Sequence, residues 1–219
     1  MLPVAPRATP LRIAQELSTR DSRVAHVISL VGEPPSRRPL AVAKRFERLA
    51  TAILHQQLAG AAAATITTRV IDALGGAMTT ESLLAAPPGV MRACGVSGAK
   101  EAALLDLATR VTEGRLRIGQ LGRMSDSDVI DVLTEVRGIG PWTAQMFLMG
   151  PLARENVWPV GDLGVRNGWS IIQRKRSTIT PELLERKGAT FEPFRSALAW
   201  YCWQAVDLAR GNGGVLPPP

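Results

Sequence analysis

The chain has 219 residues, with 26 lysines and arginines against 19 aspartates and glutamates, a formal net charge of +7. This length, with 46% hydrophobic residues, predicts a globular protein with a sizeable core and excludes a disordered chain. The two cysteines, Cys94 and Cys202, lie far apart, which excludes a disulfide scaffold and a four-cysteine metal site. No apolar run is long enough to span a bilayer, and no signal peptide is recognised. The basic balance favours a polyanionic partner, with a solvated basic face as the alternative.

Apolar residues recur at helical spacing along almost the whole chain, so we predict an all-α fold. Glycine, proline and capping residues mark the ends of the predicted helices. In chain order, the predicted helices with two defined ends cover 44–58, 65–74, 80–86, 97–114, 125–136 and 194–205. Two more are predicted between the last two ranges. One starts at Thr143, and the other is capped by Thr180 and starts at Pro181. We expect frayed ends at 1–9 and 211–219.

The most informative stretch is 133–149, with the sequence LTEVRGIGPWTAQMFLM. One helix is predicted to end at Val136, Gly138 and Gly140 make a tight reversal, and Pro141 stands where a new helix begins. Amides at a helix N-terminus bind anions, so two helices joined in this way can hold a DNA phosphate without reading a base. An ordinary helix–turn–helix connection with a glycine cap remains the alternative.

A second stretch, WPVGDLGVR at 158–166, surrounds a single carboxylate with one proline and two glycines. This carboxylate, Asp162, stands just before a new helical pattern. On spacing alone, Asp162 is interpreted as a helix N-cap, a position that aspartate favours.

Together these stretches resemble a known family. The hairpin, the loop ending in Asp162 and the closing run FRSALAWYCW occur in the order found in helix-hairpin-helix (HhH-GPD) DNA glycosylases. The resemblance covers 46–205 and is closest to the 3-methyladenine DNA glycosylase II branch. It implies that 1–219 is a single HhH-GPD unit of two helical lobes, with the active site in the cleft between the lobes.

The resemblance also implies roles for individual residues. Asp162 would be the catalytic carboxylate, which stabilises positive charge on the sugar and orients or deprotonates the attacking water. Trp142 stands where bifunctional relatives carry a Schiff-base lysine, which predicts an enzyme without strand cleavage. Trp142, Met146 and Trp203 would line the pocket for the flipped base. A core tryptophan is the alternative for Trp142, and Met146 replaces a tyrosine of one subgroup, which leaves base selectivity open.

The expected DNA contacts come from the hairpin and the early helix. Gly138, Gly140 and Thr143 would hold a phosphate through the main chain. Gln57 would fill the space that the flipped base leaves, with Leu58 as its rival.

No cofactor is expected to be required. The resemblance implies a structural Na⁺ or K⁺ ion on the backbone carbonyls of Thr134, Val136 and Ile139. Three roles stay open for Arg195: a brace of the site, a phosphate ligand or a surface cation.

We therefore predict a cytoplasmic, nucleoid-associated monomer that excises 3-methyladenine and related alkylated bases from duplex DNA and leaves an abasic site. We expect no membrane partner.

Two alternatives stay open. One is a non-catalytic DNA-binding module in which Asp162 only caps a helix. The other is a glycosylase for oxidised or mismatched bases, against which the missing lysine and cysteine cluster count. A metal-dependent nuclease is disfavoured because it needs a cluster of carboxylates.

Overall fold

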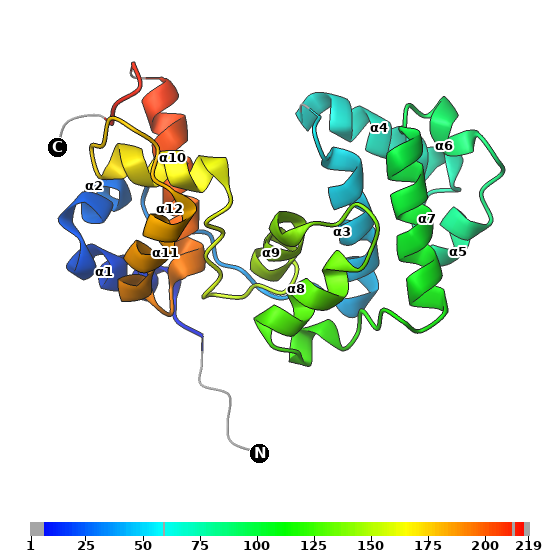
Figure 1. Cartoon of the computed structure of the whole chain (residues 1–219), viewed down its shortest axis with the longest axis horizontal. Coiled ribbons are helices and arrows are strands. Elements are labelled where there is room, and N and C mark those ends of the chain that lie inside the picture. The colour runs from blue at the N-terminus through cyan, green and yellow to red at the C-terminus, as the bar shows by residue number, and fades with distance from the viewer. Residues whose placement is uncertain (1–6, 59, 212, 217–219) are drawn as a thin grey trace. The chain divides into compact units, whose positions relative to one another are not determined.

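The computed structural model describes residues 7–58, 60–211 and 213–216. All regular elements within these ranges are helices, which confirms the predicted all-α class. The chain divides into two compact units (Figure 1). Unit 1 comprises Met1–Arg37 and Arg154–Pro219, and unit 2 comprises Arg38–Ala153. Over the described part of the chain, no helix is long and apolar enough to cross a membrane.

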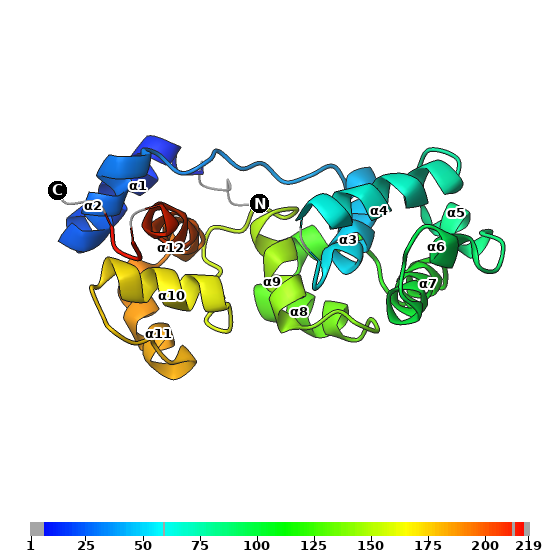
Figure 2. The same cartoon turned by 90° about the horizontal axis from the view of Figure 1, so that it is seen from above.

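Unit 1 is built around its last helix, α12. Figure 2 shows α12 between the α1–α2 pair and α10. Gly168 permits the close packing of α10 on α12, because a Cβ atom there would overlap the carbonyl group of Cys202. The helices of unit 1 are α1 (Pro10–Arg20), α2 (Ser22–Val31), α10 (Leu163–Ile172), α11 (Pro181–Gly188), the 3-10 turn η2 (Ala189–Phe191) and α12 (Arg195–Arg210).

Sequence reasoning overlooked the first two helices of unit 1. Thr9 caps α1 through its hydroxyl, and Asp21 caps α2 through its carboxylate. Thr9 therefore belongs to an ordered helix start, so the expectation of a frayed end is wrong for this residue. Positions 1–6, 212 and 217–219, which that expectation also included, lie outside the described residues.

Unit 2 is built around α3, which packs against α4, α7 and α9 (Figure 1). Side chains of Thr79, Ser97 and Ser125 cap three of its helices. The helices of unit 2 are α3 (Val42–His55), α4 (Gly60–Ala73), α5 (Thr80–Leu84), α6 (Val90–Ala93), α7 (Gly98–Thr112), the 3-10 turn η1 (Leu121–Arg123), α8 (Asp126–Thr134) and α9 (Pro141–Met149).

Several predicted helix boundaries differ from the structure, and three of them lie beside predicted site residues. The early helix ends at His55 and not at 58, because Gln56 has an extended ψ of 134° and Gln57 a left-handed φ of 56°. The hairpin's first helix ends at Thr134 rather than Val136, and its second begins at Pro141 rather than Thr143. As a result, Gln57 and Leu58 lie in the turn after the early helix, Val136 lies in the hairpin turn, and Thr143 lies inside the hairpin's second helix.

Candidate functional site

Asp162 is the N-cap of α10, as its position before a helix predicts. Its Oδ1 atom accepts hydrogen bonds from the Val165 amide at 2.7 Å and from the Trp203 indole Nε1 at 3.1 Å. The residue is only 9% exposed. The carboxylate is therefore held from two sides, by the first turn of α10 and by a side chain of α12.

Gly164 makes room for this arrangement. A Cβ atom at position 164 would lie 2.9 Å from Trp203 Cδ1 and 3.0 Å from Asp162 Oδ1. The absence of a side chain at position 164 thus lets the indole reach the carboxylate.

The Cys202 thiol lies on α12 and is fully buried. Burial, and secondly the negative charge of Asp162, raise the pKa of Cys202. The thiol therefore stays protonated at neutral pH, and Cys202 serves as a packing residue rather than a nucleophile.

Arg195 braces the segment that leads to Asp162. Its Nε donates to Asn156 Oδ1 at 2.8 Å, and its Nη2 donates to the Asn156 carbonyl at 3.2 Å. Its Nη1 also forms ion pairs with Glu192 at 3.1 Å and Glu185 at 3.4 Å. Of the three roles left open for Arg195, these contacts favour the brace.

The hairpin turn of unit 2 depends on Gly138, whose φ is 78°. Gly140 is the N-cap of α9, and no side chain of the described residues caps this helix. Pro141 occupies the first helical position, as predicted. The amides of the first turn of α9 are therefore not engaged by a capping side chain, which suits the predicted phosphate contact.

An aspartate of α7 anchors the hairpin. Asp106 Oδ2 accepts the Arg137 amide at 2.8 Å and Arg110 Nε at 3.0 Å. Burial alone raises the pKa of Asp106, but these hydrogen bonds and the charges of Arg110 and Arg115 outweigh it and lower the pKa below its usual value. The ionised carboxylate thus fixes the residue just before Gly138.

Gln56 joins the end of α3 to the hairpin. Its Nε2 donates to the Gly138 carbonyl at 2.9 Å and lies 3.3 Å from the Thr143 hydroxyl. Thr143 is buried, so a phosphate contact by Thr143 would use its main chain.

Lys100 of α7 satisfies the carbonyls at the end of α3. Its Nζ donates to the carbonyls of Leu54 at 2.6 Å and Gln56 at 2.8 Å. Desolvation by burial lowers the pKa of Lys100. The sequence analysis assigned no role to Lys100 or Gln56. The adjacent pair Gln56–Gln57 is the only sequence signal that could have indicated Gln56.

The turn between α3 and α4 presents Gln57 and Leu58. Both are exposed, and Gln57 has the left-handed backbone noted above. A conformation that is costly for a non-glycine residue is common at functional sites. The placement suits either residue as the predicted wedge.

Trp142 is not a core residue, because 48% of its surface is exposed. Met146, half-buried, follows one helical turn later on α9. Trp203 is also half-buried and contacts Asp162 in unit 1. Its neighbour Tyr201 is a core residue whose hydroxyl donates to the Gly32 carbonyl at 2.9 Å.

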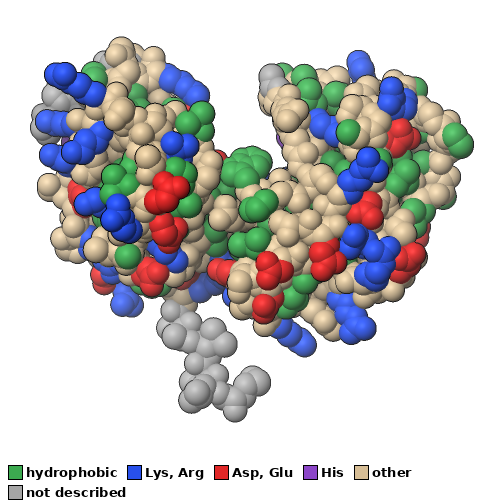
Figure 3. Space-filling model, viewed as in Figure 1, with side chains coloured by type: hydrophobic (Ala, Val, Ile, Leu, Met, Phe, Trp, Pro, Cys, Tyr) green, Lys and Arg blue, Asp and Glu red, His purple; other side chains and the backbone are tan. Residues whose placement is uncertain are grey.

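The described residues contain no group of three histidine, cysteine, aspartate or glutamate side chains placed to hold an ion. On the face shown in Figure 3, each unit carries basic side chains with acidic ones among them.

Comparisons with known proteins agree on one family. Residues 50–193 match the model of the HhH-GPD superfamily base excision DNA repair protein. DNA-3-methyladenine glycosylase 1 of Schizosaccharomyces pombe is 33% identical over 204 residues, which cover 92% of this chain and 90% of the relative.

Two solved structures share the fold. The S. pombe 3-methyladenine DNA glycosylase in complex with abasic DNA has a TM-score of 0.81 at 32% identity, covering 90% of this chain and 97% of that chain. The DNA-3-methyladenine glycosidase of Bacillus halodurans has a TM-score of 0.79 at 30% identity, covering 92% and 90%.

Proposed function

The chain belongs to the HhH-GPD superfamily of base excision DNA repair proteins, and from this premise we propose that it is a monofunctional DNA glycosylase for alkylated bases. Its substrate class is duplex DNA containing 3-methyladenine and related lesions, and its products are a free base and an abasic site. The similarity to enzymes named for 3-methyladenine supports this substrate class. The relative crystallised with abasic DNA supports the expected product.

The observation that carries the proposal is the fixed carboxylate of Asp162. Stretching of the glycosidic bond develops positive charge on the sugar, and an oriented anion lowers the energy of that state. The Val165 amide and the Trp203 indole orient the carboxylate before substrate arrives. No reorganisation of Asp162 is then needed in the transition state, and the same carboxylate can orient the attacking water.

The proposed lack of strand cleavage rests on Trp142. An indole cannot form the Schiff base that a lysine at this position would form. Its exposed surface supports a role in holding a flipped base, because extrusion gives up stacking that an aromatic ring can replace. Met146 and Trp203 are the other proposed pocket residues.

The proposed DNA contacts use the main chain of Gly138, Gly140 and Thr143 for a phosphate, and Gln57 or Leu58 for the vacated space. The left-handed Gln57 and the uncapped start of α9 support these roles. The protein is proposed to act as a monomer.

A Na⁺ or K⁺ ion is proposed at the hairpin. The carbonyls of Thr134, Val136 and Ile139 follow one another around the turn after α8, and such hard oxygen donors suit a monovalent cation. The Val136 carbonyl also accepts the Ile139 amide at 3.0 Å, so the ion would use its second lone pair. Its contribution would be to hold the turn and add positive charge beside the phosphate.

The test is base release from methylated duplex DNA by the native protein and Asp162→Asn, with and without alkali. Asparagine is also a good N-cap, so the fold should persist while release falls roughly 100-fold or more. Asp21→Asn, an equivalent change at the N-cap of α2, is the control and should release bases normally. Strand breaks before alkali treatment would contradict the assignment of Trp142.

The two alternatives give different results. A non-catalytic DNA-binding module would bind duplex DNA tightly, with no release by the native protein. A glycosylase for oxidised or mismatched bases would release those bases and leave methylated ones.

A further inference from the structure

Unit 1 contains a groove that the proposed chemistry does not use. It has a volume of about 790 Å³ and lies where α1 meets α2, beside the last turn of α10 and along α11. Its size falls within the range typical of ligand pockets, roughly 300–1,000 Å³. Asp162, at the opposite end of α10, does not line it.

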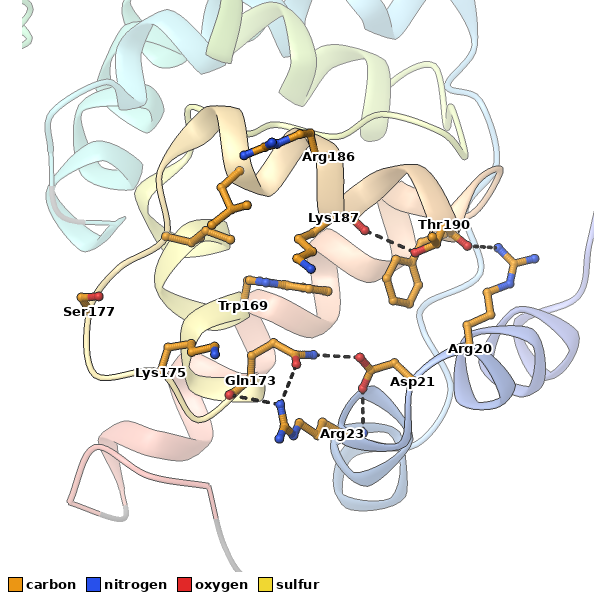
Figure 4. Close-up of a pocket in the computed structure, with 13 residues that line it drawn as sticks. Arg20, Asp21, Arg23, Trp169, Gln173, Lys175, Ser177, Arg186, Lys187 and Thr190 are labelled. Carbon is orange, nitrogen blue, oxygen red and sulfur yellow. Dashed lines mark hydrogen bonds between the residues drawn. The ribbon is translucent and has the colours of Figure 1, made fainter.

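The charge of the groove is positive. Lys175, Arg186 and Lys187 line it, and none has an ion-pair partner among the residues that the structure describes. In Figure 4 the side chains of Lys175 and Lys187 lie on either side of the Trp169 indole. Three cations therefore face the groove without local compensation.

The one acid that lines the groove is already engaged. Asp21 accepts the amides of Arg23 at 2.8 Å and Val24 at 3.1 Å, and its second oxygen accepts Gln173 Nε2 at 2.9 Å (Figure 4). These hydrogen bonds cap α2 and join α2 to the end of α10. It does not pair with Lys175 or Lys187.

Four further lining residues are apolar, and the lining is completed by the polar side chains of Arg20, Arg23, Gln173, Ser177 and Thr190. Trp169 and Phe191 are buried and pack edge to face at 5.7 Å, while Ile179 and Leu183 also line the groove. Leu183 is 38% exposed. An apolar lining beside cations resembles a protein interface, in which an apolar centre is surrounded by charged groups.

We propose that this groove binds an acidic peptide segment of a partner protein, with an apolar side chain against Leu183 and carboxylates on Lys175, Arg186 and Lys187. Clusters of basic side chains recognise acidic motifs in this way. A DNA backbone would satisfy the cations but has no aliphatic side chain to pack against Leu183 and Ile179, so the lining favours a peptide.

The test measures fluorescence anisotropy of a labelled octapeptide of alternating glutamate and leucine, titrated with the full chain at low and high salt. We expect saturable binding that weakens with salt. The triple variant K175Q/R186Q/K187Q should bind roughly tenfold more weakly, as expected for three partly exposed ion pairs.

Two controls separate charge from the groove. The variant R12Q/R117Q/R123Q makes the same change in net charge at exposed arginines outside the groove and should keep native affinity. Leu183→Ser should weaken binding of the glutamate–leucine peptide but not of a glutamate–serine peptide. Thermal melting of every variant establishes that it is folded.

Three results would overturn the proposal. One is no saturable binding of the peptide by the native chain. Another is an equal loss of affinity in both triple variants, which would show that the peptide responds to the net charge of the protein and not to the groove. The third is a groove variant that binds the peptide normally but lesion-free duplex DNA more weakly, which would assign the groove to DNA. None of these measurements depends on base release, so the proposed glycosylase activity stands or fails separately.

Discussion

At the scale of single residues, the carboxylate of Asp162 combines a structural and a proposed catalytic role. Its Oδ1 atom caps α10 and also accepts the Trp203 indole. Both contacts hold the side chain in one orientation, and Gly164 leaves the space that they need. Small changes near this carboxylate should therefore affect its orientation more than the stability of the fold.

Gly164→Ala should lower the rate of base release. The new methyl group would lie about 3 Å from both the Trp203 ring and Asp162 Oδ1, so one of them must move. A misplaced catalytic group can cost as much as 100-fold in rate. Gly161→Ala is the matched control, since an added Cβ there meets nothing within 4 Å. Single-turnover release at saturating protein compares the two, and equal rates would show that the space at 164 is unimportant.

Trp203→Phe should also slow release, because it removes the indole N–H donor to Asp162 but keeps an aromatic ring. A hydrogen bond to a charged group contributes about 1.5–3 kcal/mol, or roughly 10- to 100-fold in rate if it acts only in the transition state. Trp200→Phe on the same helix, where the ring packs on Tyr201, is the control. If Trp203→Phe releases bases at the native rate, the hydrogen bond from Trp203 to Asp162 does not contribute to catalysis, and only the proposed pocket role of Trp203 remains.

At the scale of elements, the end of α3 and the hairpin form one hydrogen-bonded assembly within unit 2. Lys100 holds the last carbonyls of α3, Gln56 reaches the hairpin turn, and Asp106 holds the amide of Arg137. The exposed Gln57 follows directly after this assembly. Its presentation to DNA should depend on α7, a helix without predicted site residues.

Lys100→Met should destabilise the protein by about 1–3 kcal/mol, because it leaves the carbonyls of Leu54 and Gln56 without their donor. Base release at subsaturating protein should fall further than release at saturation, since the turn that carries Gln57 is less ordered. Lys44→Met, at an exposed surface ion pair, should leave both unchanged. Urea unfolding measures the stability, and base release is measured at subsaturating and at saturating protein. If neither changes in Lys100→Met, Lys100 does not support the end of α3.

Asp106→Asn should give a pH-dependent loss of stability. The folded-state pKa of Asp106 is lowered, so its contribution is present above the unfolded pKa and lost as pH falls through the folded one. The difference between the native protein and the variant should be about 1 kcal/mol at neutral pH and shrink as the pH falls below the ordinary pKa of an aspartate. Urea unfolding across this range tests the sign; a difference that grows on acidification would contradict it.

At the scale of the whole molecule, the unit that carries Asp162 is assembled from both ends of the chain. The described part of Met1–Arg37 supplies α1 and α2, which pack on each other and, through α2, on α12. Leu17, Val24 and Val27 are fully buried there. The N-terminal helices are therefore part of the core of unit 1, not an appendage.

Leu17→Ala should lower the free energy of unfolding by about 2–5 kcal/mol, since it opens a cavity in that core. Leu11→Ala on the same helix should change it by less than about 0.5 kcal/mol, because Leu11 is 52% exposed. Thermal or urea unfolding distinguishes the two. A Leu17 effect as small as that of Leu11 would mean that α1 is dispensable.

The sequence by itself determined what depends on local patterns. Helical periodicity predicted an all-α chain, two glycines and a proline predicted the hairpin turn, and Asp162 before an apolar pattern predicted a helix start. These predictions held because periodicity, caps and turns depend on residues a few positions apart. The resemblance to HhH-GPD glycosylases rested on the order of the same short motifs, and the family comparison confirms it.

Only the tertiary structure decided which distant residues support the site. Trp203 reaches Asp162 across 41 positions, and Gln56 reaches Gly138 across 82. Lys100 and Asp106 carry no motif, and their roles arise because α7 packs on α3 and lies beside the hairpin turn. Such contacts depend on how whole helices pack, and a pattern along one helix records which face is buried but not which residue it meets there.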